Sequence, residues 1–346
     1  MLKRILLPLL GLYVLGAAGW VLSAGVVRDT GSMELLNVAC DPTRELWQDL
    51  NVKFIAHYRD PNGKPVSIRQ SHGGSGSQAR AVIDGLDADV ITLALWSDTD
   101  AVRKAGLIDP DWEHHLPNRS LPYVSTIVFV VRKGNPKNIH DWPDLLRLSK
   151  ANNGGIITPN PKTSGNGKWS FLAMWGSVMD RGGTEAEALE FVTELYRRVP
   201  ILDTAARAAT MTFANKQIGD VHLTWENEAH LEVQEANGEL EIVYPPASVL
   251  AEPHVAVVSS NVRRKGTEAA AEAYMRFTYT VEAQEIIAKH YYRPTNEVVR
   301  LRTVDRFPPI KLFRLSLFSP NWAEAQKRFF AENGVFDQIF ASGRTR

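Results

Sequence analysis

The sequence predicts an α/β protein whose mostly parallel sheets are covered by helices on both faces. Beyond about residue 33, continuous apolar runs alternate with runs of helical periodicity. Strands that are apolar on both sides are typical of parallel sheets buried under helices. A length of 346 residues favours two such sheets rather than one.

Each element is expected from its own pattern, taken in chain order. The expected strands are residues 34–40, 65–70, 88–95, 125–134, 154–160 and 239–245, with a further apolar run at 254–260. The expected helices are residues 41–60, 77–86, 168–180, 185–199 and two within 267–290, and residues 221–238 run from a strand into a helix. The first helix shows the spacing most clearly, through Leu46, Leu50, Phe54 and Tyr58.

The N-terminus has the pattern of an export signal. Lys3 and Arg4 precede an apolar run over residues 5–27. This run is long for a signal core and about long enough to span a bilayer, so residues 1–27 are expected to be a signal peptide or an N-terminal anchor. In both cases the basic residues stay inside and the remainder of the chain is exported.

Composition excludes several classes of function. The formal net charge is zero, so no basic field favours nucleic acid as a partner. Cys40 is the single cysteine, which rules out an intramolecular disulfide. The nine histidines show no metal-ligand spacing, so no metal site is expected, and no cofactor motif is complete.

Four strand-to-helix turns stand out because each exposes backbone N–H groups. They are "CDPTRE" at 40–45, "HGGSGS" at 72–77, "TPNPKTSGNGKWS" at 158–170 and "LDTAARAATMTF" at 202–213. In open α/β sheets, ligands lie beyond the carboxyl ends of strands, against helix N-termini. Free N–H groups at the positive end of a helix dipole bind anions. These turns therefore predict an anion site.

The same turns do not complete a nucleotide or an esterase motif. A P-loop requires Ser or Thr after Gly-Lys, whereas Trp169 follows Lys168 here. A nucleophile elbow requires a second glycine two residues after the serine, and Ser77 stands in that position after Ser75. A serine hydrolase with Ser75 or Ser164 as nucleophile, and His72 or His222 as base, is therefore a remote alternative, and we expect no enzyme.

Several blocks in order resemble a known family. They include "LLNVACDPTREL", "QSHGGSGSQA", "ITPNPKTSGNGKW", "IGDVHLTWENEA", "AEPHVAVV" and "YYRPTN". From about residue 34 to the C-terminus, the chain is similar to the periplasmic sulfate-binding proteins of sulfate/thiosulfate ABC importers. This resemblance implies a two-lobed type II periplasmic binding protein fold, with two mixed, mostly parallel sheets flanked by helices and the ligand in the cleft between lobes.

The resemblance also implies a domain division, a location and partners. Residues 34–121 and 253–346 would form lobe 1, and residues 122–252 would form lobe 2. The protein would be a periplasmic monomer that binds sulfate or thiosulfate and delivers it to the membrane permease subunits of an ABC importer.

The ligand contacts that the resemblance implies fall on the four turns and one strand end. They are the backbone N–H of Asp41, the hydroxyl of Ser75, mainly backbone N–H groups of Ser164, Gly165 and Asn166, then Ala206, and the indole N–H of Trp225. The chain departs from the family pattern at Cys40, where an aromatic is usual, and at Asn166 and Ala205, where glycine is usual. These departures concern fine specificity, because a backbone contact survives if φ stays allowed.

This set of groups contains donors only. Sulfate carries no proton at neutral pH and can only accept hydrogen bonds, whereas phosphate carries a proton that needs an acceptor. About seven charge-assisted hydrogen bonds of roughly 1.5–3 kcal/mol each could offset the cost of burying the dianion. Another tetrahedral oxyanion, molybdate or phosphate, remains the alternative ligand.

The acidic residues near these turns need partners. We expect the Asp41 carboxylate to cap its own helix, because it would otherwise repel sulfate. Glu226 and Glu228 are expected to point away or to pair with cations such as Arg207 or Lys168, although solvated surface charges are an equal alternative. His72 is expected to make a structural hydrogen bond to backbone.

Overall fold

Two four-stranded sheets organise the chain. A computed structural model describes residues 33–60 and 63–344. The first sheet has the order β10-β3-β1-β2. Its strands are β1 (Met33–Cys40), β2 (Val66–Gly73), β3 (Val90–Leu93) and β10 (His254–Val257). Strand β1 runs parallel to β2 and β3, and β10 is antiparallel to β3, so this sheet is mostly parallel as predicted.

The second sheet differs from the expectation. Its order is β6-β7-β5-β8. Its strands are β5 (Ile127–Arg132), β6 (Ile156–Ile157), β7 (Val221–Trp225) and β8 (Leu240–Val243). Strand β6 is parallel to β7, but β5 is antiparallel to both β7 and β8. An apolar strand covered on both faces has the same composition in either direction, so the sequence pattern could not reveal the reversal of β5.

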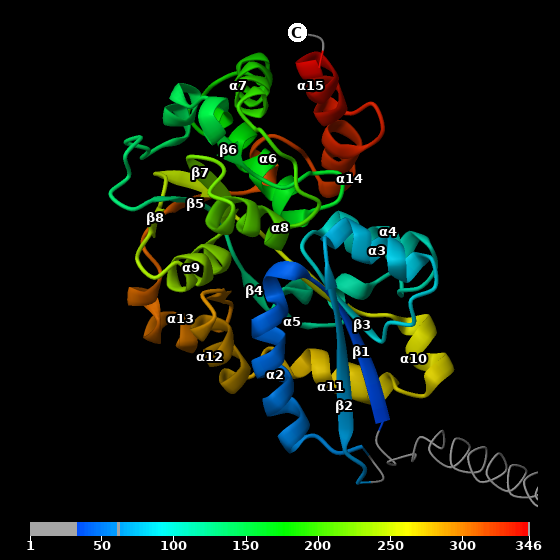
Figure 1. Cartoon of the computed structure of the whole chain (residues 1–346). Helices are drawn as coiled ribbons and strands as arrows, with labels where there is room; N and C mark the ends of the chain where they lie inside the picture. The colour runs from blue at the N-terminus through cyan, green and yellow to red at the C-terminus, as the bar shows by residue number, and fades with distance from the viewer. Residues whose placement is uncertain (1–32, 61–62, 345–346) are drawn as a thin grey trace, which may run out of the picture.

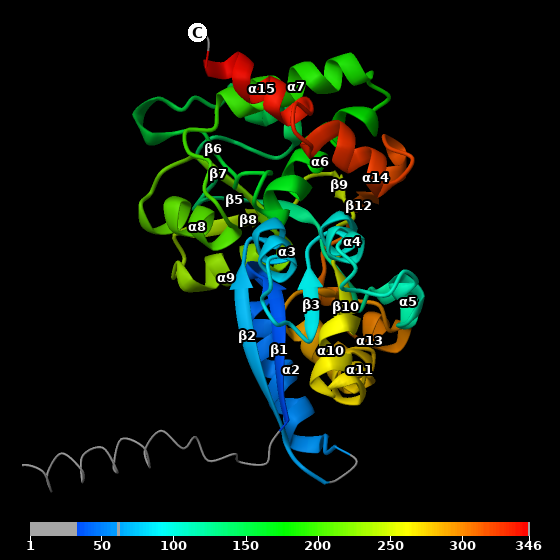
Figure 2. The same ribbon diagram turned by 90° about the vertical axis from the view of Figure 1, so that its right-hand side faces the viewer.

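Helices cover both sheets, and each sheet forms one body of the molecule together with its helices. Figures 1 and 2 show α3, α4 and α8 near the junction of the two bodies. Those around the first sheet are α2 (Arg44–His57), α3 (Ser75–Ile83), α4 (Trp96–Lys104), α5 (Pro117–Ser120), α10 (Ser259–Lys265), α11 (Glu268–Phe277), α12 (Val281–Lys289) and α13 (Glu297–Arg302). Those around the second are α6 (Gly165–Met179), α7 (Glu185–Arg197), α8 (Ala206–Thr210) and α9 (Glu226–Glu235). The sequence pattern did not predict α4, α5, α10 or α13.

Two small sheets connect distant parts of the chain. Strand β4 (Tyr123–Val124) pairs with β11 (Arg293–Pro294), and β9 (Ala247–Val249) pairs with β12 (Lys311–Phe313). The last helices, α14 (Trp322–Ala325) and α15 (Val335–Arg344), lie beside α6 and α7 in Figure 1. The C-terminal segment thus crosses from the first body to the second.

Tryptophans fill much of the interior. Trp47, Trp142, Trp169 and Trp175 are each at most 1% exposed. The predicted signal or anchor at residues 1–27 lies outside the described residues. Within the described ranges, no helix is both long enough and apolar enough to cross a membrane.

Helix α6 offers a test of core packing at Gly176. A Cβ built there would lie 2.2 Å from the Phe313 ring of β12. Helix propensity alone predicts that Gly176→Ala stabilises the protein by about 1 kcal/mol. Overpacking costs about 1–3 kcal/mol and should dominate, because Phe313 is buried. Urea unfolding should therefore show a net loss of stability, whereas Gly76→Ala, whose Cβ meets nothing closer than 3.6 Å, should show none. A more stable Gly176→Ala protein would contradict this packing.

Candidate functional site

The starts of α3, α6 and α8 meet where the two bodies touch. A Cβ built on Gly165, the first residue of α6, would lie 2.2 Å from the Cβ of Ala94 and 3.0 Å from that of Ser75. A Cβ on Gly74 would lie 2.6 Å from the carbonyl oxygen of Thr163 and 3.2 Å from that of Thr204. Three of the four predicted turns are therefore packed together, and side chains at Gly74 and Gly165 would separate them.

Two hydrogen bonds hold these turns in place. The Thr163 hydroxyl donates to the carbonyl of Thr204 over 2.7 Å, which joins the turn before α6 to the turn before α8. The Trp169 indole donates to the carbonyl of Ala94 over 2.8 Å, which joins α6 to the end of β3. The first bond lies within the second body, and the second bond crosses to the first.

The predicted residues on α6 present their amides as expected of a helix start. The Ser164 hydroxyl caps the helix by accepting from Gly167 N at 3.3 Å, and Ser164 N donates to Asn160 O at 2.9 Å. Helix geometry leaves the N–H groups of Gly165 and Asn166 without an intrahelical acceptor. Those two amides remain for a ligand.

The departures from the family pattern do not strain the backbone. Asn166 lies in the first turn of α6, and its side chain donates to the Thr224 hydroxyl at 3.4 Å. Ala205 is the N-cap of α8 with φ −152° and ψ 167°, which is extended backbone open to any residue. Ala206 follows at the first helical position, is 2% exposed, and has an N–H without an intrahelical acceptor.

Trp225 ends β7, directly after the Thr224 that Asn166 contacts. Its side chain is fully buried. Among the described residues, its indole nitrogen has no hydrogen-bond partner. A buried donor left unpaired costs about 1–3 kcal/mol, which a bound acceptor would recover. Pattern alone would have placed Trp225 in the core. Its unpaired donor points to a ligand because it ends the strand β7, which contacts both α6 and α8, where the free helix amides lie.

Ser75 lies in the predicted place, but its hydroxyl is engaged. The side chain is 1% exposed, accepts from Ala94 N at 2.9 Å, and donates to Asp98 Oδ2 at 2.7 Å. The other oxygen of Asp98 lies 2.6 Å from Lys168 Nζ in a buried ion pair between α4 and α6. A hydroxyl has one proton, so the predicted donation by Ser75 to an anion requires that proton to leave Asp98.

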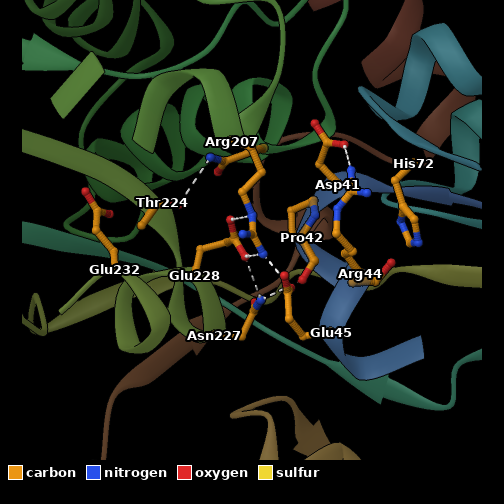
Figure 3. Close-up of polar contacts among 12 residues, drawn as sticks. Asp41, Pro42, Arg44, Glu45, His72, Arg207, Thr224, Asn227, Glu228 and Glu232 are labelled. Atoms are coloured by element: carbon orange, nitrogen blue, oxygen red, sulfur yellow. Dashed lines mark hydrogen bonds and ion pairs between the residues drawn. The ribbon is translucent and has the colours of Figure 1, made fainter. Parts of the chain in front are cut away.

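The expectation for the Asp41 carboxylate was wrong. No side chain caps the short helix Asp41–Thr43, and the N-cap of α2 is Thr43, whose hydroxyl donates to Cys40 O. Asp41 Oδ1 instead lies 3.6 Å from Arg44 Nη2, as Figure 3 shows. Burial raises the pKa of Asp41, and the charges of Arg44 and Arg207 oppose that rise.

The other acids of this region are paired, as one of the two alternatives predicted. Arg207 on α8 contacts Glu228 on α9 at 2.9 Å and also bonds Glu45 on α2, so it links the two bodies (Figure 3). Glu226 is held by two bonds from Arg293, at 2.7 and 2.8 Å. The Glu228–Arg207 pair is thus confirmed. The suggested partner Lys168 binds Asp98 instead, and the Arg293 pair was missed because 67 residues separate its members.

Comparisons with known proteins identify the family of this chain. A family model described as "Bacterial extracellular solute-binding protein" matches residues 36–293. The chain belongs to this family. Over 309 residues it is 50% identical to the sulfate-binding protein of Escherichia coli (strain K12), covering 89% of this chain and 93% of that relative. It is 46% identical over 309 residues to the thiosulfate-binding protein of Pseudomonas aeruginosa, covering 89% and 92%.

A solved structure supports the same family. The sulfate-binding protein SubI from Mycobacterium tuberculosis H37Rv matches with a TM-score of 0.77 and 32% sequence identity, covering 86% of this chain and 99% of that chain. The predicted two-lobed type II periplasmic binding protein fold is thereby confirmed for this solute-binding protein.

The serines and histidines of the hydrolase alternative have other partners. Within the described part of the chain, no hydrogen bond joins Ser75 or Ser164 to a histidine. His72 lies 3.4 Å from Cys40 O, the expected structural contact, and burial lowers its pKa to about 4. Burial raises the pKa of the Cys40 thiol. Across residues 33–60 and 63–344, no group of three or more His, Cys, Asp or Glu side chains could hold a metal ion.

The buried carboxyl group of Glu228 should make the stability of the protein depend on pH. Burial raises its pKa from 4.5 to about 7, against the lowering effect of Arg207. The folded protein therefore holds this proton more tightly than the unfolded chain, and the associated stability is present below pH 4.5 and lost as pH rises through about 7. The unfolding free energy of the wild type, relative to Glu228→Gln, should fall by about 2–3 kcal/mol between pH 5 and pH 8.

Chemical unfolding at four pH values measures this difference. Glu190→Gln, at an exposed position on α7, is the matched control and should show no such trend. A difference between wild type and Glu228→Gln that is flat with pH, or that grows as pH rises, would contradict the assignment.

Proposed function

We propose that this protein is an extracytoplasmic receptor that binds sulfate or thiosulfate where the helix starts meet, and delivers it to the permease of an ABC importer. The observation that carries the proposal is the buried indole N–H of Trp225, which has no acceptor among the described residues. It lies beside helix starts whose first amides also lack intrahelical acceptors. The relatives named for sulfate and thiosulfate support the same ligand class.

The ligand contacts are part of this proposal. They are the backbone N–H groups of Asp41, Ser164, Gly165, Asn166 and Ala206, the hydroxyl of Ser75 and the indole of Trp225. Ser164 N already donates to Asn160 O, so its contribution would come from its hydroxyl or require that bond to open. Ser75 would contribute once its proton turns from Asp98 towards the anion.

The nearby charges favour an anion that needs no counter-ion and no acceptor. Lys168 and Arg207 are each held by carboxylates, and Asp98 is occupied by Ser75 and Lys168. Hydrogen phosphate would bring a proton that requires an acceptor, whereas sulfate would not. Molybdate has the same acceptor chemistry as sulfate, and competition between the two ions separates them.

The lobe division, the expected motion and the cellular location are also part of the proposal. The lobes would follow the two sheets, with residues 34–121 and 253–346 around the first and residues 122–252 around the second. Helix α15 packs on α7, so the end of lobe 1 would reach across to lobe 2. Closure of the lobes on the anion is the expected motion. The protein would act as a monomer in the periplasm, with residues 1–27 as its signal peptide or anchor.

Trp225→Phe tests the proposal directly. The substitution removes the indole N–H and keeps an aromatic ring, so sulfate affinity should fall by about 1–3 kcal/mol, which is roughly 5-fold to 150-fold. Trp47→Phe is a control for the same substitution, because Trp47 is also fully buried but lies in α2 against Tyr274.

Titration calorimetry with sulfate and thiosulfate measures both variants. Sulfate affinity should be unchanged in Trp47→Phe and reduced in Trp225→Phe. An absence of heat from the wild type with either anion would refute the function, and equal affinities in the two variants would remove Trp225 from the site.

A further inference from the structure

The end of the chain packs against the turn that leads into α6. Residues 322–337, which we call the C-terminal brace, comprise α14, the π-helix Gln326–Phe330 and the first residues of α15. Figure 1 shows α14 and α15 beside α6 and α7. The brace is remote in sequence from the proposed anion site, and yet it contacts the helix whose first amides are proposed to bind the anion.

Lys162 joins the turn before α6 to the brace. Its Nζ donates to the carbonyls of Phe330 and Ala331 at 3.0 and 3.1 Å, and to Asp337 Oδ2 at 2.9 Å. An ammonium group has three donors, and these three acceptors occupy all of them. Lys162 therefore has no donor left for an anion, although it lies two residues before Ser164.

Two residues near the start of α6 also contact the brace. Lys168 Nζ donates to Gln326 Oε1 at 3.3 Å. The ring of Trp169 meets the ring of Trp322 edge-on, with centroids 5.0 Å apart and an interplanar angle of 88°. Since Lys162 attaches the turn that precedes this helix, the brace is fastened both before and after the first amides of α6.

Backbone hydrogen bonds connect Lys162 to the proposed anion donors. Lys162 N donates to Asn160 Oδ1 at 2.9 Å, and the carbonyl of Asn160 accepts from Ser164 N, also at 2.9 Å. The turn is thus a small hydrogen-bonded unit, so a shift of Lys162 would also move Ser164 and the Gly165 amide that follows it. A loop held in its binding conformation gives higher affinity than a loop that must be ordered on binding.

We propose that Lys162 is a positioning residue of the anion site and that the C-terminal brace is a structural part of that site. Lys162 holds the turn before α6 in its binding conformation without touching the anion. This inference rests on the proposed function, because it concerns the affinity for sulfate. Residues that act without ligand contact can change affinity by about threefold to thirtyfold.

Lys162→Met and Lys162→Arg test this role in the full chain. Methionine removes the three donors, so sulfate affinity should fall by about threefold to thirtyfold. Arginine restores donors for the carbonyls and for Asp337, so Lys162→Arg should bind sulfate more tightly than Lys162→Met. Titration calorimetry well below the unfolding temperature measures both, and circular dichroism shows that each variant is folded.

Arg328→Met is the matched control. Arg328 pairs with Glu185 at 2.7 Å, so it fastens the same brace to α7 rather than to the turn. A purely structural role would lower the unfolding temperature of Lys162→Met and Arg328→Met and leave both sulfate affinities as in the wild type. Sulfate affinity within about twofold of the wild type in Lys162→Met, or an equal loss in Arg328→Met, would overturn the proposal.

Hydrogen exchange without sulfate adds a measurement that does not depend on the ligand. The amides of residues 162–168 should exchange faster in Lys162→Met than in the wild type, and at the wild-type rate in Arg328→Met. If the wild type bound neither sulfate nor thiosulfate, the proposed function would fail, and the exchange rates would still decide whether Lys162 orders this turn.

Asp337→Asn covers the case in which Lys162→Met does not fold. It removes the charge from one of the three acceptors and leaves both carbonyls, so sulfate affinity should fall by about twofold to fivefold. Unchanged affinity would show that the attachment does not matter. Tighter binding would make Lys162 a counter-ion for the anion, and either result would overturn the proposal.

Discussion

The close approach of two helix starts at Gly165 determines the rest of the site. The first residue of α6 lies so near Ala94 and Ser75 that a single added carbon would fall 2.2 Å from its neighbour. Two helices that belong to different sheets can therefore direct their first amides to one buried place. The glycines of this region supply space, and Gly74 plays the same part between the turns before α6 and α8.

Burying this junction requires its charges to be balanced within the protein. Lys168 is neutralised by Asp98, and Arg207 by Glu45 and Glu228, with both sets bridging the two bodies. These cations hold the bodies together and leave little free positive charge for an anion. Any anion bound there would be stabilised mainly by backbone dipoles and by the Trp225 indole. The proposed anion receptor therefore needs no excess of positive charge, in line with a formal net charge of zero.

The sequence predicted much of the fold and the turns that form the site. The elements and contacts that it did not predict have physical causes. Strands β1 and β3 follow from their apolar runs and helix α7 from its hydrophobic periodicity, and two of the four turns follow from their Gly and Ser content. Helix α4 was missed because its buried residues Ser97, Asp98 and Thr99 are polar. The hydrogen bonds of Asp98 with Ser75 and Lys168 could not be predicted, because the bonded residues are 23 and 70 positions apart in the sequence. The direction of β5 depends on three-dimensional strand pairing that no local pattern encodes.

A donor-only site predicts a definite preference between two tetrahedral anions. Competition calorimetry of sulfate against phosphate, at pH 6 and at pH 8, tests this claim most directly. Sulfate should bind at both pH values, and phosphate should displace it poorly at both, because even the doubly charged form retains one proton that finds no acceptor. Displacement of sulfate by phosphate at comparable concentrations would show an acceptor in the site and would contradict the account.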